Sequence, residues 1–526
     1  MGENRRMRVA DGRITGGWIR ALPVILGLCW TFGCSGPEAE PSRDARPNFQ
    51  GITLTLGAVG DPEILAGITA QRGEWIASRE GEIEIVDEPA DPSEPSKAAE
   101  FDVLVFPGWA LGNLIDRELL EEIPNSVVLP PQPAQDVEED EEETGYQYED
   151  LAPAFREQAS KYGTERYALP LGGSALVLAY RRDALESEAN LAAAEELGIS
   201  LKPPATWEEL DALAGFFQGR DWDGDGSPDF GLAAALGADD AEGVGNATFL
   251  ARAASLGWHR DQYSFLFDSD DMAPRIDSPP FVEALKGIAG WKDLGPPGAE
   301  TFDIAAARAA FREGKTALLI DRAEKAAEWS AGKLIGVAPL PGSARVYEPL
   351  RKIWTEDSSP NRPTHLPRGG GWLVGVRRGL ETKKREAAFD LILYLTEADV
   401  ANRIAAERIF PMLPVRARWM GRGLPDPASA PDVDPRLWSD AVSQSLLAER
   451  VLPGLRIPDA NGYLADLAKG RVDAVSGGKA PEEALGEIAA AWTKRTQDHG
   501  PRRQLWHYRR SLNALATLPT PPPKGE

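Results

Sequence analysis

Apolar and polar residues alternate over residues 52–59, which predicts a β-strand at the start of the folded part of the chain. Helical spacing follows over residues 62–79, a second strand is predicted at 82–86, and an apolar strand at 101–106. Strands that alternate with helices predict a parallel sheet covered by helices, and ligands usually bind at the ends of such strands. The fold class is therefore expected to be α/β.

Residues 166–180, with the sequence RYALPLGGSALVLAY, place a Gly-Gly-Ser turn directly before a six-residue apolar run. This pattern predicts a chain that leaves one lobe, turns beside a cleft and enters a central strand. Residues 204–213, PATWEELDAL, predict the start of a helix, because Thr206 and Glu209 have the spacing of a capping box.

These segments resemble the extracellular solute-binding proteins of ABC importers, in the cluster that contains maltose-binding protein and other carbohydrate receptors. The resemblance covers about residues 50–495 and rests on the order of its motifs. The further motifs that carry it are FREGKTALLIDRAEKA from Phe311, IGVAPLPGS from Ile335, GGGWLVGV from Gly369, the helix at 381–396, RIFPMLPVR from Arg408 and KAPEEALGEIAAAW from Lys479.

The resemblance implies a periplasmic-binding-protein-like fold, in which two α/β lobes are joined by a hinge and enclose a ligand cleft. The N-lobe is expected from residues 51–165 and 377–425, and the C-lobe with the hinge segments from 166–376 and 426–500. Within these, the hinge falls at 169–174 and 369–376. An acidic loop at 130–150 is treated as an insertion, since its like charges repel one another. Residues 501–526 are expected to form a C-terminal tail.

The N-terminus is typical of a secretory signal, because five arginines precede the short apolar run at 21–33. Residues 1–33 are expected to be removed and 34–50 to form a flexible tether. Cys34 resembles the lipidated cysteine of bacterial lipoproteins, although Thr31 and Phe32 depart from the usual residues before it. The alternative, a buried helix, would have to tolerate Pro23. We expect an exported, lipid-anchored protein that faces the periplasm or the cell exterior.

Composition narrows the function further. The 526 residues are 42% hydrophobic, enough for a core, and the net charge of −25 disfavours nucleic-acid binding. Cys29 and Cys34 are the only cysteines, so the body of the chain has no disulfide framework. The GKT sequence at residues 314–316 is not a phosphate-binding loop, because Ala309 occupies the position of the first required glycine.

A calcium loop is predicted at DWDGDGSPDFG. Asp221, Asp223, Asp225 and Asp229 have the spacing of an EF-hand-like loop, with Gly226 at the tight turn. Leu232 stands where the usual bidentate glutamate would be, so Asp239, Asp240, Glu242 or water would have to supply that ligand. A plain acidic turn is the alternative. We expect a structural calcium ion and no other cofactor.

The ligand site is expected to use tryptophans, since aromatic rings pack on sugar C–H faces while polar side chains bind the hydroxyls. The chain has 15 tryptophans, and Trp109 follows a strand while Trp372 follows three glycines. Trp258 is the next candidate. By resemblance, polar contacts come from residues at the strand ends, namely Asp61, Glu63, Ser174, Asp321 and Arg322.

The expected function is capture of a carbohydrate, such as an oligosaccharide, by hinge closure for delivery to an ABC permease. The protein is expected to act as a monomer and without catalysis. Two alternatives remain open at this point: an exported glycan hydrolase that uses paired carboxylates, and a receptor that reports its ligand to a membrane sensor.

Overall fold

The computed structural model describes residues 47–129, 146–238, 243–259, 262, 264–330, 332–420 and 430–513. Residues 48–526 form one compact unit. The predicted signal peptide, Cys34, most of the tether, the core of the acidic loop and the end of the predicted tail lie outside the described residues. Within the described residues, no helix combines the length and the apolar character needed to cross a bilayer.

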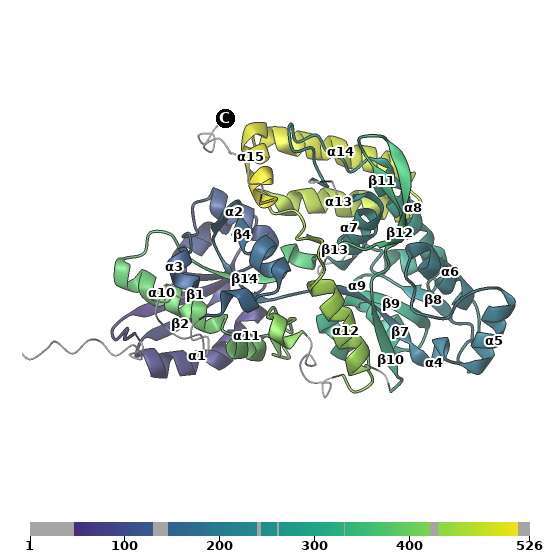
Figure 1. Ribbon diagram of the computed structural model, residues 1–526, viewed down its shortest axis with the longest axis horizontal. Helices are drawn as coiled ribbons and strands as arrows, with labels where there is room; N and C mark the ends of the chain where they lie inside the picture. The colour runs from purple at the N-terminus through teal and green to yellow at the C-terminus, as the bar shows by residue number, and fades with distance from the viewer. Residues whose placement is uncertain are drawn as a thin grey trace, which may run out of the picture. The chain divides into compact units, whose positions relative to one another are not determined.

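The first sheet has five strands in the order β2-β1-β3-β14-β6 (Figure 1). The three strands nearest the N-terminus are parallel, whereas β14 runs antiparallel to both of its neighbours. The strands are β1 (Thr53–Val59), β2 (Glu82–Ala90), β3 (Val103–Pro107), β6 (Leu169–Gly172) and β14 (Trp372–Val376). Helices α1 (Leu65–Arg79), α10 (Thr382–Leu395) and α11 (Ala398–Ala405) pack on this sheet. The predicted strands and helices of this region are confirmed, but the sheet is mixed.

The second sheet has four strands in the order β10-β7-β9-β8. Strands β8 and β9 are parallel, and β7 is antiparallel to β9 and β10. The strands are β7 (Leu176–Arg181), β8 (Phe230–Ala233), β9 (Thr316–Arg322) and β10 (Ile335–Pro339). Every residue of β7 and β9 is buried, as expected for central strands covered on both faces.

The chain passes from the first sheet to the second at residues 173–175, between β6 and β7. This agrees with a crossover at the Gly-Gly-Ser turn. Residues 169–172 and 372–376, which lie in the predicted hinge segments, are strands of the first sheet. Their backbone groups pair with that sheet, and so the pairing decides which sheet they belong to.

Helix α6 (Trp207–Phe217) begins as predicted. The Thr206 hydroxyl accepts from the Glu209 backbone amide at 3.2 Å, and the Glu209 carboxylate accepts from the Thr206 amide at 3.3 Å. The capping box is confirmed. The remaining helices are α2 (Leu111–Asp116), α3 (Asn125–Val128), α4 (Arg182–Leu185), α5 (Glu188–Glu196), α7 (Val244–Gly257), α8 (Pro279–Gly290), α9 (Ile304–Arg312), α12 (Pro435–Leu446), α13 (Ala460–Val475), α14 (Pro481–Asp498) and α15 (Pro501–Ser511). The short strands are β4 (Lys161–Tyr162), β5 (Glu165–Arg166), β11 (Ser343–Glu348), β12 (Ile353–Asn361), β13 (Thr364–His365) and β15 (Val451–Leu452).

The tail predicted from residue 501 is wrong for its first part, since residues 501–511 form helix α15. Pro501 occupies the first turn, where its missing N–H is tolerated. Gln504, His507 and Tyr508 are buried, and the Tyr508 hydroxyl lies 2.7 Å from the Ser264 hydroxyl. The helix packs near α14 (Figure 1) and belongs to the folded body.

We predict that Tyr508→Ala lowers the free energy of unfolding by about 3–5 kcal/mol, because it leaves a cavity where a buried ring stood. Tyr508→Phe removes only the hydroxyl and is expected to lower it by about 1 kcal/mol. Urea denaturation followed by tryptophan fluorescence measures both values. A Tyr508→Ala protein as stable as the wild type would mean that α15 does not contribute to the fold.

Candidate functional site

A first cavity of about 270 Å³ lies at the end of β3, against helices α7 and α13. Trp109 borders it from the turn that follows β3, and Leu250 borders it from α7. The chain segment that leads into β14 supplies His365, Leu366, Arg368 and Gly369. The cavity is thus bordered by segments far apart in the sequence, as expected for a ligand site in an α/β protein.

Two glycines place Trp109 beside this segment. Gly108 N donates to Gly371 O at 2.9 Å, and a Cβ atom on Gly108 would lie 2.1 Å from Gly369 O. Gly369 itself has a φ of +72°, and its Cβ would lie 2.2 Å from Trp109 N. Only residues without side chains allow this approach. Trp109 is partly buried against the core and faces the cavity, so the structure agrees with its predicted location.

Amide and guanidinium side chains provide the polar part of the first cavity. Asn246 on α7 donates to Leu464 O at 2.9 Å, which fixes the orientation of its amide. Asn461 near the start of α13 donates to Ser93 Oγ at 3.2 Å. Arg368 has its guanidinium carbon 6.0 Å from the ring centre of Trp372. These groups can donate to or accept from hydroxyl groups of a neutral ligand.

His365, like Asn246, Asn461 and Arg368, borders this cavity but was not predicted from the sequence. Its side chain is 8% exposed and borders both the first cavity and a second one. Neither ring nitrogen has a hydrogen-bond partner among the described residues. Burial lowers its pKa to about 4, so the imidazole is neutral at pH 7. The four histidines are scattered in the sequence, and no spacing or motif distinguishes this one.

The second cavity, of about 260 Å³, has Trp258 in its wall. The indole nitrogen donates to Gln262 O at 2.9 Å, and the Arg450 guanidinium lies 4.8 Å from the centre of the ring. Trp258 was predicted as a contact of the same ligand as Trp109. The structure places the two tryptophans in separate cavities that share four residues, namely Leu250, His365, Gly454 and Leu455.

Asp321 and its neighbour Arg322 were predicted as ligand contacts, but the structure buries both. Asp321 is fully buried, and its carboxylate accepts from the Arg308 guanidinium at 2.6 and 2.8 Å and from Trp329 Nε1 at 2.7 Å. Arg322 is 3.5 Å from the carboxylate of Glu324. The carboxylate of Asp321 is already paired in the core, and so Asp321 has a structural role in this conformation.

Ser174 is also buried, and its hydroxyl donates to Glu324. Burial raises the pKa of that carboxyl group.

Trp372 is 2% exposed and packs edge to face on Phe410, with ring centres 5.3 Å apart. It therefore packs in the core, because its strand β14 is central in the first sheet.

The last two predicted contacts lie at the end of β1. The Asp61 carboxylate caps the following turn by accepting from Glu63 N at 3.0 Å, and Glu63 is exposed. Of the eight predicted ligand residues, only Trp109 and Trp258 border either of the two cavities described here. Neither cavity is bordered by the other six, which are Asp61, Glu63, Ser174, Asp321, Arg322 and Trp372.

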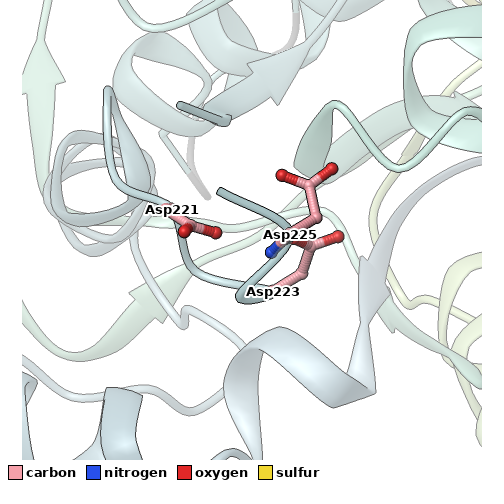
Figure 2. A group of neighbouring side chains, drawn as sticks. All are labelled: Asp221, Asp223 and Asp225. Atoms are coloured by element: carbon pink, nitrogen blue, oxygen red, sulfur yellow. Dashed lines mark hydrogen bonds between the residues drawn. The ribbon is translucent and has the colours of Figure 1, made fainter. Parts of the chain in front are cut away.

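The predicted calcium loop connects α6 to β8. Carboxylate oxygens of Asp221, Asp223 and Asp225 lie within 4.8 Å of one another, and all three residues are exposed (Figure 2). Two oxygens that both bind Ca²⁺ at 2.3–2.6 Å can be at most roughly 5 Å apart, so this spacing suits the ion. The Asp221 carboxylate accepts from Gly224 N at 2.8 Å and Gly226 N at 3.0 Å. Both glycines have positive φ, which the tight loop requires.

Asp229 completes the predicted ligand set but lies deeper in the protein. It is 6% exposed, and one of its carboxylate oxygens has no hydrogen-bond partner among the described residues. Burial, together with the negative charge of Asp223, raises its pKa to about 6. Leu232 is buried in β8 and supplies no ligand. Residues 239–242, proposed as substitutes for the missing glutamate, lie outside the described residues.

Comparison with known families identifies one match. A family model described as bacterial extracellular solute-binding protein matches residues 90–418. The match begins at the last residue of β2, includes β3, β6 and β14 of the first sheet and all four strands of the second, and ends after α11. Among curated protein sequences, none matches this chain.

Several solved structures share the fold. Maltose-bound MalE3 of T. maritima is 18% identical, with a TM-score of 0.58 over 84% of this chain and 100% of that chain. A solute-binding protein from Agrobacterium radiobacter in complex with ribitol is 19% identical, with a TM-score of 0.57 over 85% and 100%. The cyclic α-maltosyl-1,6-maltose-binding protein of Arthrobacter globiformis is 17% identical, with a TM-score of 0.57 over 85% and 99%. The predicted periplasmic-binding-protein-like α/β fold is thereby confirmed.

We predict that Asp321→Asn lowers the free energy of unfolding by about 3 kcal/mol, because it removes the buried carboxylate of the Arg308–Asp321 pair and leaves Arg308 with only the half-exposed carboxylate of Glu328. Asp498→Asn is the matched control. It removes one partner of the exposed Lys494–Asp498 pair and is expected to change stability by less than about 0.5 kcal/mol. Urea denaturation measures both variants. If Asp321→Asn weakened ligand binding but left stability unchanged, the structural role assigned to Asp321 would be wrong.

Proposed function

We propose, because this chain belongs to the bacterial extracellular solute-binding protein family, that it captures a carbohydrate outside the cytoplasm and delivers it to an ABC permease. Membership of this family implies an exported protein. We further propose that Cys34 carries a lipid anchor and that the protein acts as a monomer. The ligand is bound and released without chemical change.

The observation that carries this proposal is the composition of the first cavity. An aromatic ring, Trp109, stands beside amide groups of Asn246 and Asn461 and the guanidinium of Arg368. Sugars and polyols present C–H faces to aromatic rings and hydroxyls to such polar groups. Two of the structural relatives described above were solved with maltose and with ribitol, which are uncharged polyhydroxy compounds. A neutral polyhydroxy ligand agrees with both.

Capture would proceed by closure of the two sheets and their helices around the ligand. The crossover at 173–175 connects the sheets through two adjacent residues of small size, Gly173 and Ser174, which can absorb a change in backbone angles. A ligand that contacts both sides of the cavity binds the closed form better and shifts the population towards it. The permease would then recognise the closed form.

We also propose that the loop at residues 221–229 binds calcium as a structural ion. The support is the spacing of its three exposed carboxylates and the unpartnered, buried oxygen of Asp229. A cation would balance a cluster of negative charge that otherwise repels itself. The loop sits between α6 and β8, where it would fix the connection from helix to strand and take no part in ligand capture.

We predict that at least one of maltose, maltotriose, ribitol and mannitol raises the melting temperature of the protein and is recovered unchanged by chromatography. A ligand at 100 times its Kd adds about 2.7 kcal/mol to the stability of the native state. Trp109→Ala is expected to weaken binding at least tenfold, as measured by calorimetry, because the sugar loses its aromatic surface. Trp506→Ala on α15 is the control and should leave affinity unchanged. Failure of these and other neutral saccharides to bind, or recovery of a hydrolysed product, would contradict the proposal.

For the calcium loop, we predict that 10 mM CaCl₂ raises the melting temperature by roughly 3–10 °C relative to chelator, as expected for weak extracellular calcium sites. Asp223→Asn should remove this shift, because it removes a central ligand. Asp498→Asn, an exposed acid on α14, should retain it. Equal melting temperatures of the wild type in calcium and in chelator would show that the loop is a plain acidic turn.

A further inference from the structure

The second cavity differs in chemistry from the first. Its wall includes Trp258, Phe265, Leu266, Leu452 and Leu512, so most of it is apolar. Its volume of about 260 Å³ exceeds the 150 Å³ or so of an engineered apolar cavity that binds benzene. The cavity is therefore large enough for a substituted ring.

Two polar groups in this wall lack partners. Both ring nitrogens of His365 are unpaired among the described residues, although its side chain is more than nine-tenths buried. Gln262 donates its amide to Ser264 O at 2.7 Å, but its buried Oε1 atom has no partner. Buried polar groups are nearly always paired in folded proteins, so these unpaired atoms point to a ligand that supplies the missing bonds.

The unpaired atoms also define what the ligand must offer. A neutral imidazole has one donor and one acceptor, and an amide oxygen only accepts. A hydroxyl group, which donates and accepts, satisfies either of them. An ionised group would lose its hydration in an apolar cavity without gaining a counter-charge from these neutral side chains. The occupant is thus an uncharged ring with a hydroxyl group.

We propose that the second cavity is a subsite for the apolar, hydroxylated aglycone of a glycoside whose sugar occupies the first cavity. This inference rests on the proposed function, since it takes the first cavity as the sugar site. The two cavities share His365, Leu250, Gly454 and Leu455, so they are adjacent, and the proposal places the link between sugar and aglycone beside these four residues. Tyr508 also borders the second cavity, and the hydrogen bond between its hydroxyl and that of Ser264 fixes this part of helix α15.

The test compares three probes by calorimetry on the full chain: maltose, phenyl α-maltoside and 4-hydroxyphenyl α-maltoside. We expect 4-hydroxyphenyl α-maltoside to bind at least tenfold more tightly than maltose, and phenyl α-maltoside to lie between them. Leu452→Trp fills the second cavity and should remove the gain without changing maltose affinity. Leu512→Trp is a second filling variant, in case the first does not fold. Equal affinities of the three probes, or a gain that persists in both folded filling variants, would overturn the proposal.

His365→Phe supplies an independent readout. It keeps a ring of similar size but removes the unpaired nitrogens, so the melting temperature without ligand should rise. The affinity difference between 4-hydroxyphenyl and phenyl α-maltoside should fall at least threefold in the same variant. A residue with only a packing role would not give these opposite changes, and an unchanged affinity difference would remove His365 from the subsite.

A fourth probe separates this inference from the proposed function. Binding of 4-fluorophenol, followed by ¹⁹F NMR line broadening, requires the second cavity but no sugar site. If 4-fluorophenol binds the wild type but not Leu452→Trp, while no saccharide binds, the aromatic subsite stands and the sugar assignment fails. If maltose binds but 4-fluorophenol does not, the sugar assignment stands and the subsite fails.

Discussion

The pairing of β14 with β3 and β6 is the constraint on which the site depends. A strand at residues 372–376 enters the sheet between strands formed more than 190 residues earlier in the chain. Gly369 and Gly371 allow this, since a Cβ on Gly371 would lie 2.3 Å from Gly172 O, a distance that no real side chain adopts. The pairing brings the segment from His365 to Gly369 against Trp109. Without it, no first cavity would form at this sheet edge.

Three buried arginines in the body of the protein form several hydrogen bonds each. Arg471 donates to the carbonyls of Ala235 and Leu236, and Arg308 donates two hydrogen bonds to the carboxylate of Asp321. Arg456 donates to the carbonyl groups of Gln158, Ala159 and Lys161, although burial lowers its pKa to about 10. Arg471 and Arg456 thereby supply donors to buried backbone carbonyl groups. His365 is a contrast, because its entire polar part is unpaired.

Local signals in the sequence predicted local structure well. Thr206 and Glu209 satisfy each other's backbone groups within one turn, and so their spacing suffices to locate the helix start. Helix α15 was not predicted, since residues 501–511 were included in the expected C-terminal tail. Its burial depends on Tyr508 and His507 meeting distant partners, Ser264 and Tyr162. Asp321 was assigned to the ligand site by family resemblance, yet tertiary packing turns it towards α9, where Arg308 neutralises it. Such outcomes depend on three-dimensional contacts that spacing along the chain does not encode.

His365 and Asp229 lie in different parts of the protein, but both have buried polar atoms without a hydrogen-bond partner among the described residues. Each is a polar side chain held in the protein interior without a protein partner, which lowers stability in the free state. Core positions can usually be filled by apolar residues at no such penalty, so a polar residue kept there is better explained by a partner that binds later. For Asp229 the charge of its neighbours selects a cation. For His365 the apolar wall selects a neutral ring. His365 and Asp229 are thus two positions at which a ligand of matching chemistry would supply the missing partner.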